Sequence, residues 1–510
     1  MLFMRYFIYF AMIFLLFLTA GCSDGDSQSA KNGKSNLLVD VIKGEKYSPE
    51  EFMKVVSPKE QFKELHELFP DLHPMIETIM RTKMLSRLVT LDALFQLEVG
   101  CNSKHQRQWQ MESYVFTYMS KSADGADVLL SGRVTFPNNM VEGVGHEVET
   151  LSIFSHPKIP GVSWVPSNNL DIMMLRAFFN SAVIEPDFQG YGVDEGKHKN
   201  SAYVPKVTML QLADCVTAAL EVMRQHDVKL APEGFSENWG GSHTSATTVY
   251  FQKYYETEAP AWFRKAVRLR SSFVTTNIRD YNVAEIQDIT GPEPRSSEAF
   301  REVITSLTTQ SPAQMRGYKI SDFLSYRAMT EKVGDGDNKM TAYQYMTRLI
   351  AYPNVTNLAG PIADWTLVDL AAPEMLTANG LYNMSNPKAA DMVDIFHNMN
   401  DYGDFKPTLP IYLCQHKEDE YFTQDDFMTY CTKLSENGTN PNVHYANIPL
   451  KTTNSLVYDT IGIQYNHFLS YVLSMLYAVT SPTAAEAFEN VIKENYYSPL
   501  SIDCLVHMCA

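Results

Sequence analysis

Short apolar stretches alternate with amphipathic ones along the middle of the chain. Residues 151–154 and 182–184 are apolar runs that predict buried strands, and the runs at 266–269, 411–414 and 443–446 continue the series. One face of the segment after the second run carries apolar residues at helical spacing: Met209, Leu212, Val216, Ala219 and Met223. Because strands that alternate with helices form parallel sheets, the pattern predicts an α/β fold with a mostly parallel central sheet and helices on both faces.

A hairpin is predicted ahead of this alternation. Residues 113–119 and 128–136 have the composition of strands, and Asp124 followed by Gly125 is a strong turn signal between them.

The N-terminal region divides into two parts of different composition. Residues 23–47 are rich in Ser, Asp, Asn, Gly and Lys and have few apolar anchors, which predicts a flexible tether. From residue 48 the pattern is helical, and Ser48 with Glu51 three residues later matches a capping box. We therefore expect an N-terminal helical segment over 48–109.

The alternation of strands and helices stops between about residues 285 and 404. This stretch is loop-rich and helical, without a strong strand pattern. An insertion of such length between late strands is more often a cap or lid than a structureless loop. We expect a core in two parts, 110–284 and 405–510, with a helical cap insertion at 285–404 between them.

Composition and charge narrow the classes of function. The 510 residues are 45% hydrophobic and 12% aromatic, as in globular proteins. The formal net charge of −17 argues against a nucleic-acid partner, because no basic stripe is present to neutralise phosphates. No zinc-ligand spacing, P-loop or dinucleotide fingerprint occurs, so the sequence predicts no metal and no cofactor.

The first residues predict export. Arg5 precedes an apolar run at 7–18 that is too short for a comfortable membrane span and is typical of a signal peptide. Small residues lead directly to Cys22, and this ending resembles the lipobox of bacterial lipoproteins, in which the cysteine is acylated. Ser23 resembles sequences sent on to the outer membrane. We expect residues 1–22 to be a lipoprotein signal peptide that ends at the lipobox cysteine, and lipid chains on Cys22 to hold the exported protein at a bacterial membrane. The alternative is an ordinary cleaved signal peptide in which Cys22 has no special role.

Ser242 is the preferred candidate for a nucleophile. A nucleophile elbow is a sharp strand-to-helix turn, and its crowding demands small residues around the nucleophile. Gly240 and Gly241 precede Ser242, and a helical stretch follows it. Ser236 also has a glycine two positions before it, but a poor helix start follows, and its strand would contain Pro232, which is awkward in a central strand.

A serine nucleophile needs a histidine as general base and a carboxylate that orients the histidine. Asp419 lies in the loop just beyond the predicted strand 411–414, with Glu418 and Glu420 as neighbouring alternatives. His467 precedes an apolar stretch that predicts one of the last helices.

An oxyanion needs two backbone N–H donors. The first candidate is His243, directly after the nucleophile. The second should come from the loop after 151–154, where Pro157 has no N–H and Lys158 is therefore the candidate donor.

These segments together resemble the α/β-hydrolase superfamily, and within it the secreted lipase and esterase group. That group has a His-Gly-Thr loop followed by Pro-Ser, then Pro-Asp-Tyr-x-Gly-x-Gly, then Gly-Tyr-Ser-Gln-Gly-Gly. The chain has His-Pro-Lys at 156–158, Val-Pro-Ser at 165–167 and Pro-Asp-Phe-Gln-Gly-Tyr-Gly at 186–192, and Thr244 stands where the usual elbow motif has glycine. The resemblance spans about 110–480, apart from the cap, and implies the α/β-hydrolase fold with a triad in the chain order serine, acid, histidine.

The resemblance implies a serine hydrolase that cleaves carboxylic esters through a Ser-His-Asp triad and an acyl-enzyme. Its partner would be a small-molecule, lipid or glycan ester. A peptidase with the same triad is an alternative, because the fold does not choose the substrate. A non-catalytic surface lipoprotein that keeps the scaffold for binding is another, favoured by the departures at Pro157 and Thr244.

Replacement of Cys22 tests the lipid anchor. The Cys22→Ser variant should stay unprocessed by lipoprotein signal peptidase, because the acylated thiol is missing. Metabolic labelling with a fatty-acid analogue should label the wild type and leave the variant unlabelled. Equal labelling of both proteins would contradict the anchor.

Overall fold

The computed structural model describes residues 37–48, 51, 110–122, 125–138, 146–156, 165–168, 172–195, 197–198, 201, 204–241, 244–275, 318–334, 339–344, 365, 367–379, 383–391, 402–416, 424–448, 481 and 483–497. Every structural statement below refers to these residues.

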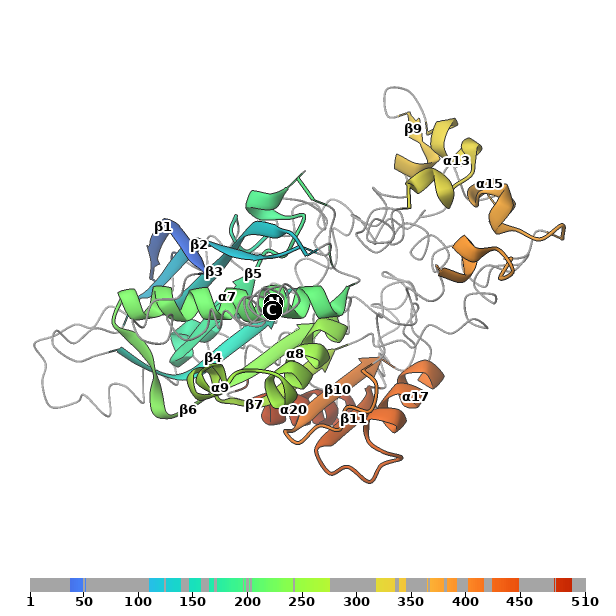
Figure 1. The fold of residues 1–510 in the computed structure, drawn as a ribbon. Coiled ribbons are helices and arrows are strands. Elements are labelled where there is room, and N and C mark those ends of the chain that lie inside the picture. Colours follow the sequence, from blue (N-terminus) through green and yellow to red (C-terminus); the bar gives the residue numbers. More distant parts are fainter. Residues whose placement is uncertain are drawn as a thin grey trace, which may run out of the picture.

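A nine-stranded sheet forms the centre of the described chain (Figure 1). In spatial order its strands are β1 (Leu38–Tyr47), β2 (Met111–Lys121), β3 (Asp127–Pro137), β5 (Ser181–Pro186), β4 (His146–Ser155), β6 (Val228–Gly241), β7 (Leu269–Thr275), β10 (Ile411–His416) and β11 (Val443–Ile448). The pairs from β1 to β5 are antiparallel, and all pairs from β5 to β11 are parallel. The predicted α/β fold with a mostly parallel sheet is confirmed.

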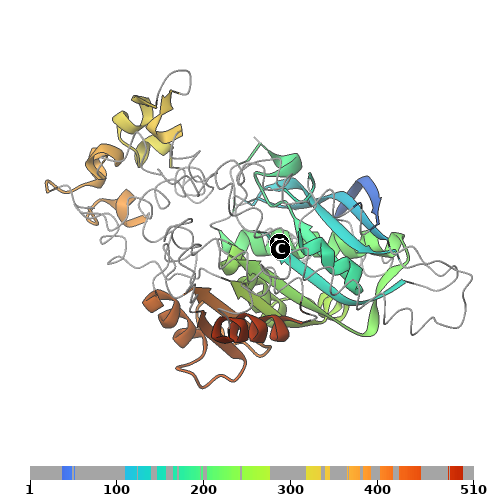
Figure 2. The ribbon, with the colours of Figure 1, turned by 180° about the vertical axis from the view of Figure 1, so that it is seen from behind.

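Helices cover both faces of this sheet. On one face lie α7 (Pro205–Gln225), α8 (Ser245–Thr257), α9 (Ala261–Val267) and α17 (Gln424–Leu434); on the other lie the 3-10 helix η2 (Ile172–Phe179) and α20 (Ala484–Tyr497). Figure 1 shows α7 and α8 in front of the strands, and Figure 2, seen from behind, shows α20 in front. No helix among the described residues is long and apolar enough to cross a membrane.

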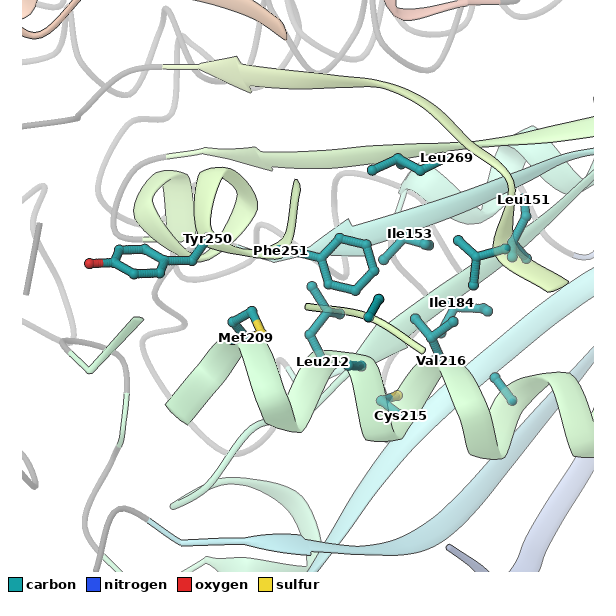
Figure 3. Packing of buried hydrophobic residues seen from close by; sticks show 14 of the residues in the cluster. Leu151, Ile153, Ile184, Met209, Leu212, Cys215, Val216, Tyr250, Phe251 and Leu269 are labelled. Carbon is teal, nitrogen blue, oxygen red and sulfur yellow. The ribbon is translucent and has the colours of Figure 1, made fainter. Parts of the chain in front are cut away.

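Two apolar clusters join the helices to the sheet. Ile153 belongs to the cluster under α7, whereas its neighbour Phe154 belongs to the cluster under α20, because successive strand side chains point to opposite faces. In Figure 3, Leu212 and Val216 of α7 pack toward Ile153. The apolar face predicted for this helix is therefore the face that it buries.

Two local predictions are confirmed at atomic level. Gly125 has a φ of 84°, a left-handed conformation that glycine adopts without strain, and it lies in the turn between β2 and β3. Ser48 and Glu51 form both bonds of a capping box: the Ser48 N–H donates to Glu51 Oε2 at 2.8 Å, and the Glu51 N–H donates to Ser48 Oγ at 3.2 Å.

The predicted tether at 23–47 is wrong for its second part, because residues 38–47 form the edge strand β1. Its backbone pairs with β2, and Leu38 and Val41 pack against the sheet's larger apolar cluster. Val39, Val41 and Ile42 are β-branched residues that favour strands, and this signal was present in the sequence.

The strand predicted at 266–269 is also wrong. Ala266 belongs to α9, and Arg268, which follows the helix, has a φ of 53°. This left-handed residue ends the helix, and β7 begins only at Leu269.

The described parts of 285–404 contribute no strand to the nine-stranded sheet. They hold the short helices η5 (Ile320–Asp322), α13 (Tyr326–Thr330), α15 (Leu367–Leu370) and η8 (Pro373–Met375), and the strands β8 (Lys332–Val333) and β9 (Met340–Thr341), which pair with each other. In both views α13, β9 and α15 lie together at one side, away from the sheet (Figures 1 and 2).

A buried carboxylate fastens α20 to the sheet. Glu237 of β6 has no exposed surface, and its Oε1 accepts the backbone N–H of Ala484 at 3.0 Å and a guanidinium N–H of Arg270 at 2.8 Å. The guanidinium of Arg176 lies 3.7 Å from Oε2 and also donates to the carbonyl of Ser481 at 2.9 Å. One carboxylate therefore joins β6, β7, η2 and the start of α20.

The Glu237→Gln substitution should lower the free energy of unfolding by about 3–5 kcal/mol, because it leaves the buried Arg176 cation without its counter-charge. Urea denaturation measures this change. The matched control is Glu147→Gln, which breaks the exposed pair of Glu147 with Lys229 on the neighbouring strands β4 and β6. The control should change stability by less than about 1 kcal/mol. Equal effects of the two substitutions would contradict the proposed role of Glu237.

Candidate active site

The carboxyl ends of the parallel strands meet at one edge of the sheet. The chain runs from β4 to β5 on one side of β4, then crosses to β6 on the other side. Ligand sites in open α/β sheets lie outside the carboxyl ends of the strands at such a reversal of strand order. This rule points to the ends of β4 and β6, at Ser155 and Gly241.

The six predicted site residues lie outside the described residues, and their neighbours along the chain locate the segments that carry them. Ser242 and His243 directly follow the last residue of β6, and Lys158 follows the end of β4 by three positions. Asp419 follows the end of β10 by three positions. His467 comes after β11, and Cys22 comes before β1. The predicted triad and oxyanion donors stay predictions.

Ser236, the rival nucleophile, lies inside β6. Its side chain is fully buried, and its hydroxyl donates to the backbone carbonyl of Val267. A side chain in this position lies in the middle of a strand, away from the strand-to-helix turn, and is not accessible from the surface. The structure therefore excludes Ser236 as the nucleophile.

Pro232 does lie in β6, and a register shift accommodates it. The pairing of β6 with β4 runs to Val148↔Leu230 and resumes at Thr150↔Phe235, so Pro232 falls in the interval without ladder pairs. Pro232 therefore does not count against this strand, and the conclusion about Ser236 rests on its burial inside β6.

β6 turns directly into α8 at a point of very close approach. A Cβ on Gly240 would lie 2.0 Å from Thr248 Oγ1 and 3.2 Å from the Thr244 carbonyl oxygen. Only glycine lets the strand and the first turns of the helix approach this closely. The end of β6 and the first turns of α8 therefore approach each other as closely as a nucleophile elbow requires.

Thr244, the departure from the glycine motif, is buried and makes specific hydrogen bonds. Its hydroxyl lies 2.8 Å from the carbonyl oxygen of Ser155, 2.9 Å from that of Gly241 and 3.3 Å from the Gly241 N–H. The side chain connects the end of β4 with the end of β6. The β-branched residue fits this turn and has a role there that glycine lacks.

The Pro-Asp-Phe motif anchors the segment after the predicted oxyanion loop. Asp187 is fully buried; one carboxylate oxygen accepts the Ser167 N–H at 2.9 Å, and the other accepts the Ser131 hydroxyl. Gly192 has a φ of 57°, and a Cβ there would lie 2.1 Å from the same carboxylate. The motif's aspartate and last glycine are thus required by packing.

Arg133, which the sequence gave no reason to select, holds the same segment from β3. This buried guanidinium donates to the carbonyl of Pro166 at 2.5 Å and to that of Ser167 at 3.2 Å, and to the Ser113 hydroxyl at 2.8 Å. No local pattern could indicate this role, because the partners of Arg133 lie 20 or more residues away along the chain.

A thiol nucleophile is disfavoured among the described residues. Cys215, Cys414 and Cys431 are buried free thiols. Burial raises the pKa of Cys215 well above its ordinary value, and the negative charge of Asp187 raises it further. Burial likewise raises the pKa of Cys431. A thiol kept protonated at neutral pH is a poor nucleophile. The described residues also contain no cluster of side chains that could hold a metal ion.

No protein-family model matches the sequence, and no curated protein matches it either. Among solved structures, the chain is similar to a ligand-bound form of the rice cell wall degrading esterase LipA from Xanthomonas oryzae, with 12% identity, a TM-score of 0.54, and coverage of 88% of this chain and 98% of that one. Another structure of the same esterase has 15% identity and a TM-score of 0.52, over 75% and 92% of the two chains. Candida antarctica lipase A in its closed state has 12% identity and a TM-score of 0.47, over 75% and 79%. Together with the sheet order, the likeness to the esterase shows the α/β-hydrolase fold.

The Gly240→Ala substitution tests the close approach of β6 and α8. The added methyl group should lower the free energy of unfolding by about 1–3 kcal/mol, because it must displace Thr248. Adding Thr248→Ala removes the oxygen at 2.0 Å and should restore part of that stability, which a double-mutant cycle in urea measures. Strictly additive losses would show that the two residues do not touch.

Proposed function

We propose that this protein is an exported serine hydrolase that cleaves carboxylic esters, with Ser242 as nucleophile, His467 as general base and Asp419 as the acid that orients the histidine. The observation that carries the proposal is the strand–turn–helix packing at Gly240 and Thr248, which brackets Ser242. The acid and the histidine follow later strands in the chain order of the fold.

The proposed reaction has two stages. His467 takes the proton of the Ser242 hydroxyl as the oxygen attacks the ester carbonyl, and the same proton then passes to the leaving alkoxide. The resulting acyl-enzyme is attacked by water, which His467 deprotonates, and the acid product and free serine are released. The backbone N–H groups of His243 and Lys158 stabilise the oxyanion at both stages.

The substrate class in this proposal is a small-molecule, lipid or glycan ester outside the cell. Solved neighbours with TM-scores above 0.5 include an esterase described as degrading rice cell walls, which favours esters over peptides. Acylated Cys22 would hold the enzyme at a bacterial membrane, and a peptidase with the same triad is the runner-up.

The second candidate is a binding protein that has lost catalysis. This candidate was favoured by two departures from the family pattern, Thr244 in the elbow motif and Pro157 in the predicted oxyanion loop. Thr244 is accommodated by hydrogen bonds at the turn, so it no longer argues for lost activity. Pro157 remains the one feature in its favour.

Reaction with a fluorophosphonate probe separates the two candidates. The wild type should be labelled, and Ser242→Ala should not be labelled, with kcat lower by up to about a millionfold as in other serine hydrolytic triads. Ser236→Ala is the control and should keep its labelling. Ser236 is buried inside β6, and its hydroxyl donates to the backbone carbonyl of Val267. A wild type that neither reacts with the probe nor hydrolyses esters would favour the binding protein.

The other two members of the triad give a graded result. Asp419→Asn should lower kcat by roughly ten-thousandfold, because the histidine then takes the wrong tautomer. Adding His467→Ala to Ser242→Ala should change little further, because members of one catalytic unit are not additive. Full activity of Asp419→Asn would contradict the assignment of Asp419 and indicate Glu418 or Glu420 as the acid of the triad.

A further inference from the structure

We propose that Thr244 is a positioning residue, whose hydroxyl locks the nucleophile turn to the end of β4 and so fixes the two segments that supply the oxyanion donors. The inference rests on the proposed function and goes beyond it. The triad does not use Thr244, and the glycine of the usual motif lacks the group that makes these bonds.

The hydrogen bonds of Thr244 are the first support. Its one hydroxyl proton is donated to a carbonyl oxygen, either Ser155 at 2.8 Å or Gly241 at 2.9 Å, and its oxygen accepts the Gly241 N–H at 3.3 Å. The side chain is 2% exposed, so water does not compete for these bonds. A single buried group therefore contacts both strand ends.

The second support is a capping bond that Thr244 does not make. Thr244 is the N-cap residue of α8, a position at which threonine ordinarily accepts an N–H from the first turn of the helix. Here the side chain makes no such bond. Its hydroxyl is directed instead toward Ser155 and Gly241, as expected for a group whose role is at the strand ends.

The position of this bond explains its effect on the reaction. Backbone pairing between β4 and β6 ends at Ser155↔Gly240, and the bond from Thr244 to Ser155 lies one step beyond it. The chain enters the loop to Lys158 at Ser155, and it enters Ser242 and His243 at Gly241. Since an oxyanion hole works only when its two donors are fixed relative to each other, a link between these two points sets its geometry.

Thr244 is itself held from the other side. Its carbonyl oxygen accepts the Thr248 hydroxyl at 3.0 Å, and Thr248 is the residue that packs against Gly240. The turn is therefore braced at the strand, at the helix and at the neighbouring strand. Loss of the Thr244 hydroxyl removes its bonds to Ser155 and Gly241, and leaves the bond from Thr248 and the packing of Thr248 against Gly240.

Three variants test the role of the hydroxyl. Thr244→Val replaces it with a methyl group of similar size, Thr244→Ser keeps it, and Thr244→Ala is a second hydroxyl-free variant that adds no bulk. The matched control is Thr247→Val, which removes another buried hydroxyl of α8, bonded to Thr208 at 2.7 Å on the face toward α7. Circular dichroism and urea denaturation establish that each variant is folded.

The readouts are kcat and KM for a p-nitrophenyl ester and the inhibition constant of a trifluoromethyl ketone, which forms a tetrahedral oxyanion on the serine. Thr244→Val and Thr244→Ala should lower kcat by about 10- to 100-fold with KM little changed, and should weaken the inhibitor by a similar factor. Thr244→Ser should restore both values. Thr247→Val should leave both unchanged.

Two results would overturn the inference while the proposed function survives. One is an active wild type whose kcat and inhibitor binding are unaffected in Thr244→Val and Thr244→Ala. The other is an equal loss in Thr247→Val, which would make the effect one of general stability. A wild type inert toward both the ester and the fluorophosphonate probe would overturn the proposed function first, and this inference with it.

Discussion

The close approach of β6 and α8 is the constraint on which the candidate site depends. Gly240 leaves no room for a Cβ beside Thr248, so the strand must turn into the helix within the few residues between them. A sharp turn of this kind exposes a side chain above the carboxyl edge of the sheet, where the ends of the parallel strands meet. The strand order places β4, the strand before the predicted oxyanion loop, directly beside this turn.

The sequence predicted elements well where the signal is local. The turn at Gly125, the capping box of Ser48 and Glu51 and the apolar face of α7 depend on residues a few positions apart, and each is present in the structure. The errors have local causes as well. Residues 38–47 were predicted as tether because polar residues surround the β-branched ones, although the β-branched residues favour a strand. The boundary between α9 and β7 depends on the left-handed conformation of Arg268, which the periodicity of apolar residues does not reveal.

Contacts between distant parts of the chain could not be predicted. Arg133, Asp187 and Glu237 are buried charges whose partners come from other strands and helices. In a sequence Arg133 and Glu237 resemble ordinary exposed residues, because a single charge in a strand pattern usually faces water. Asp187 belongs to the Pro-Asp-Phe motif, but the motif does not reveal its partners. The candidate triad was proposed from chain order and strand ends, and the structure adds the exclusion of Ser236 and the reason that Thr244 is tolerated.

The buried charges, like the close approach of β6 and α8, hold particular backbone segments in one position. Asp187 and Arg133 fix the segment that follows the predicted oxyanion loop, and Glu237 fixes the start of α20, which follows the segment that carries His467. An ion held in a low-dielectric interior is costly unless its partners are fixed, so each of these groups imposes one position on the backbone that it contacts. The proposed triad needs that property, because its residues are far apart in the chain and must meet within hydrogen-bond reach. The sheet brings the ends of its parallel strands to one edge, and the buried polar bonds fix the backbone at Pro166, Ser167 and Ala484 relative to the sheet.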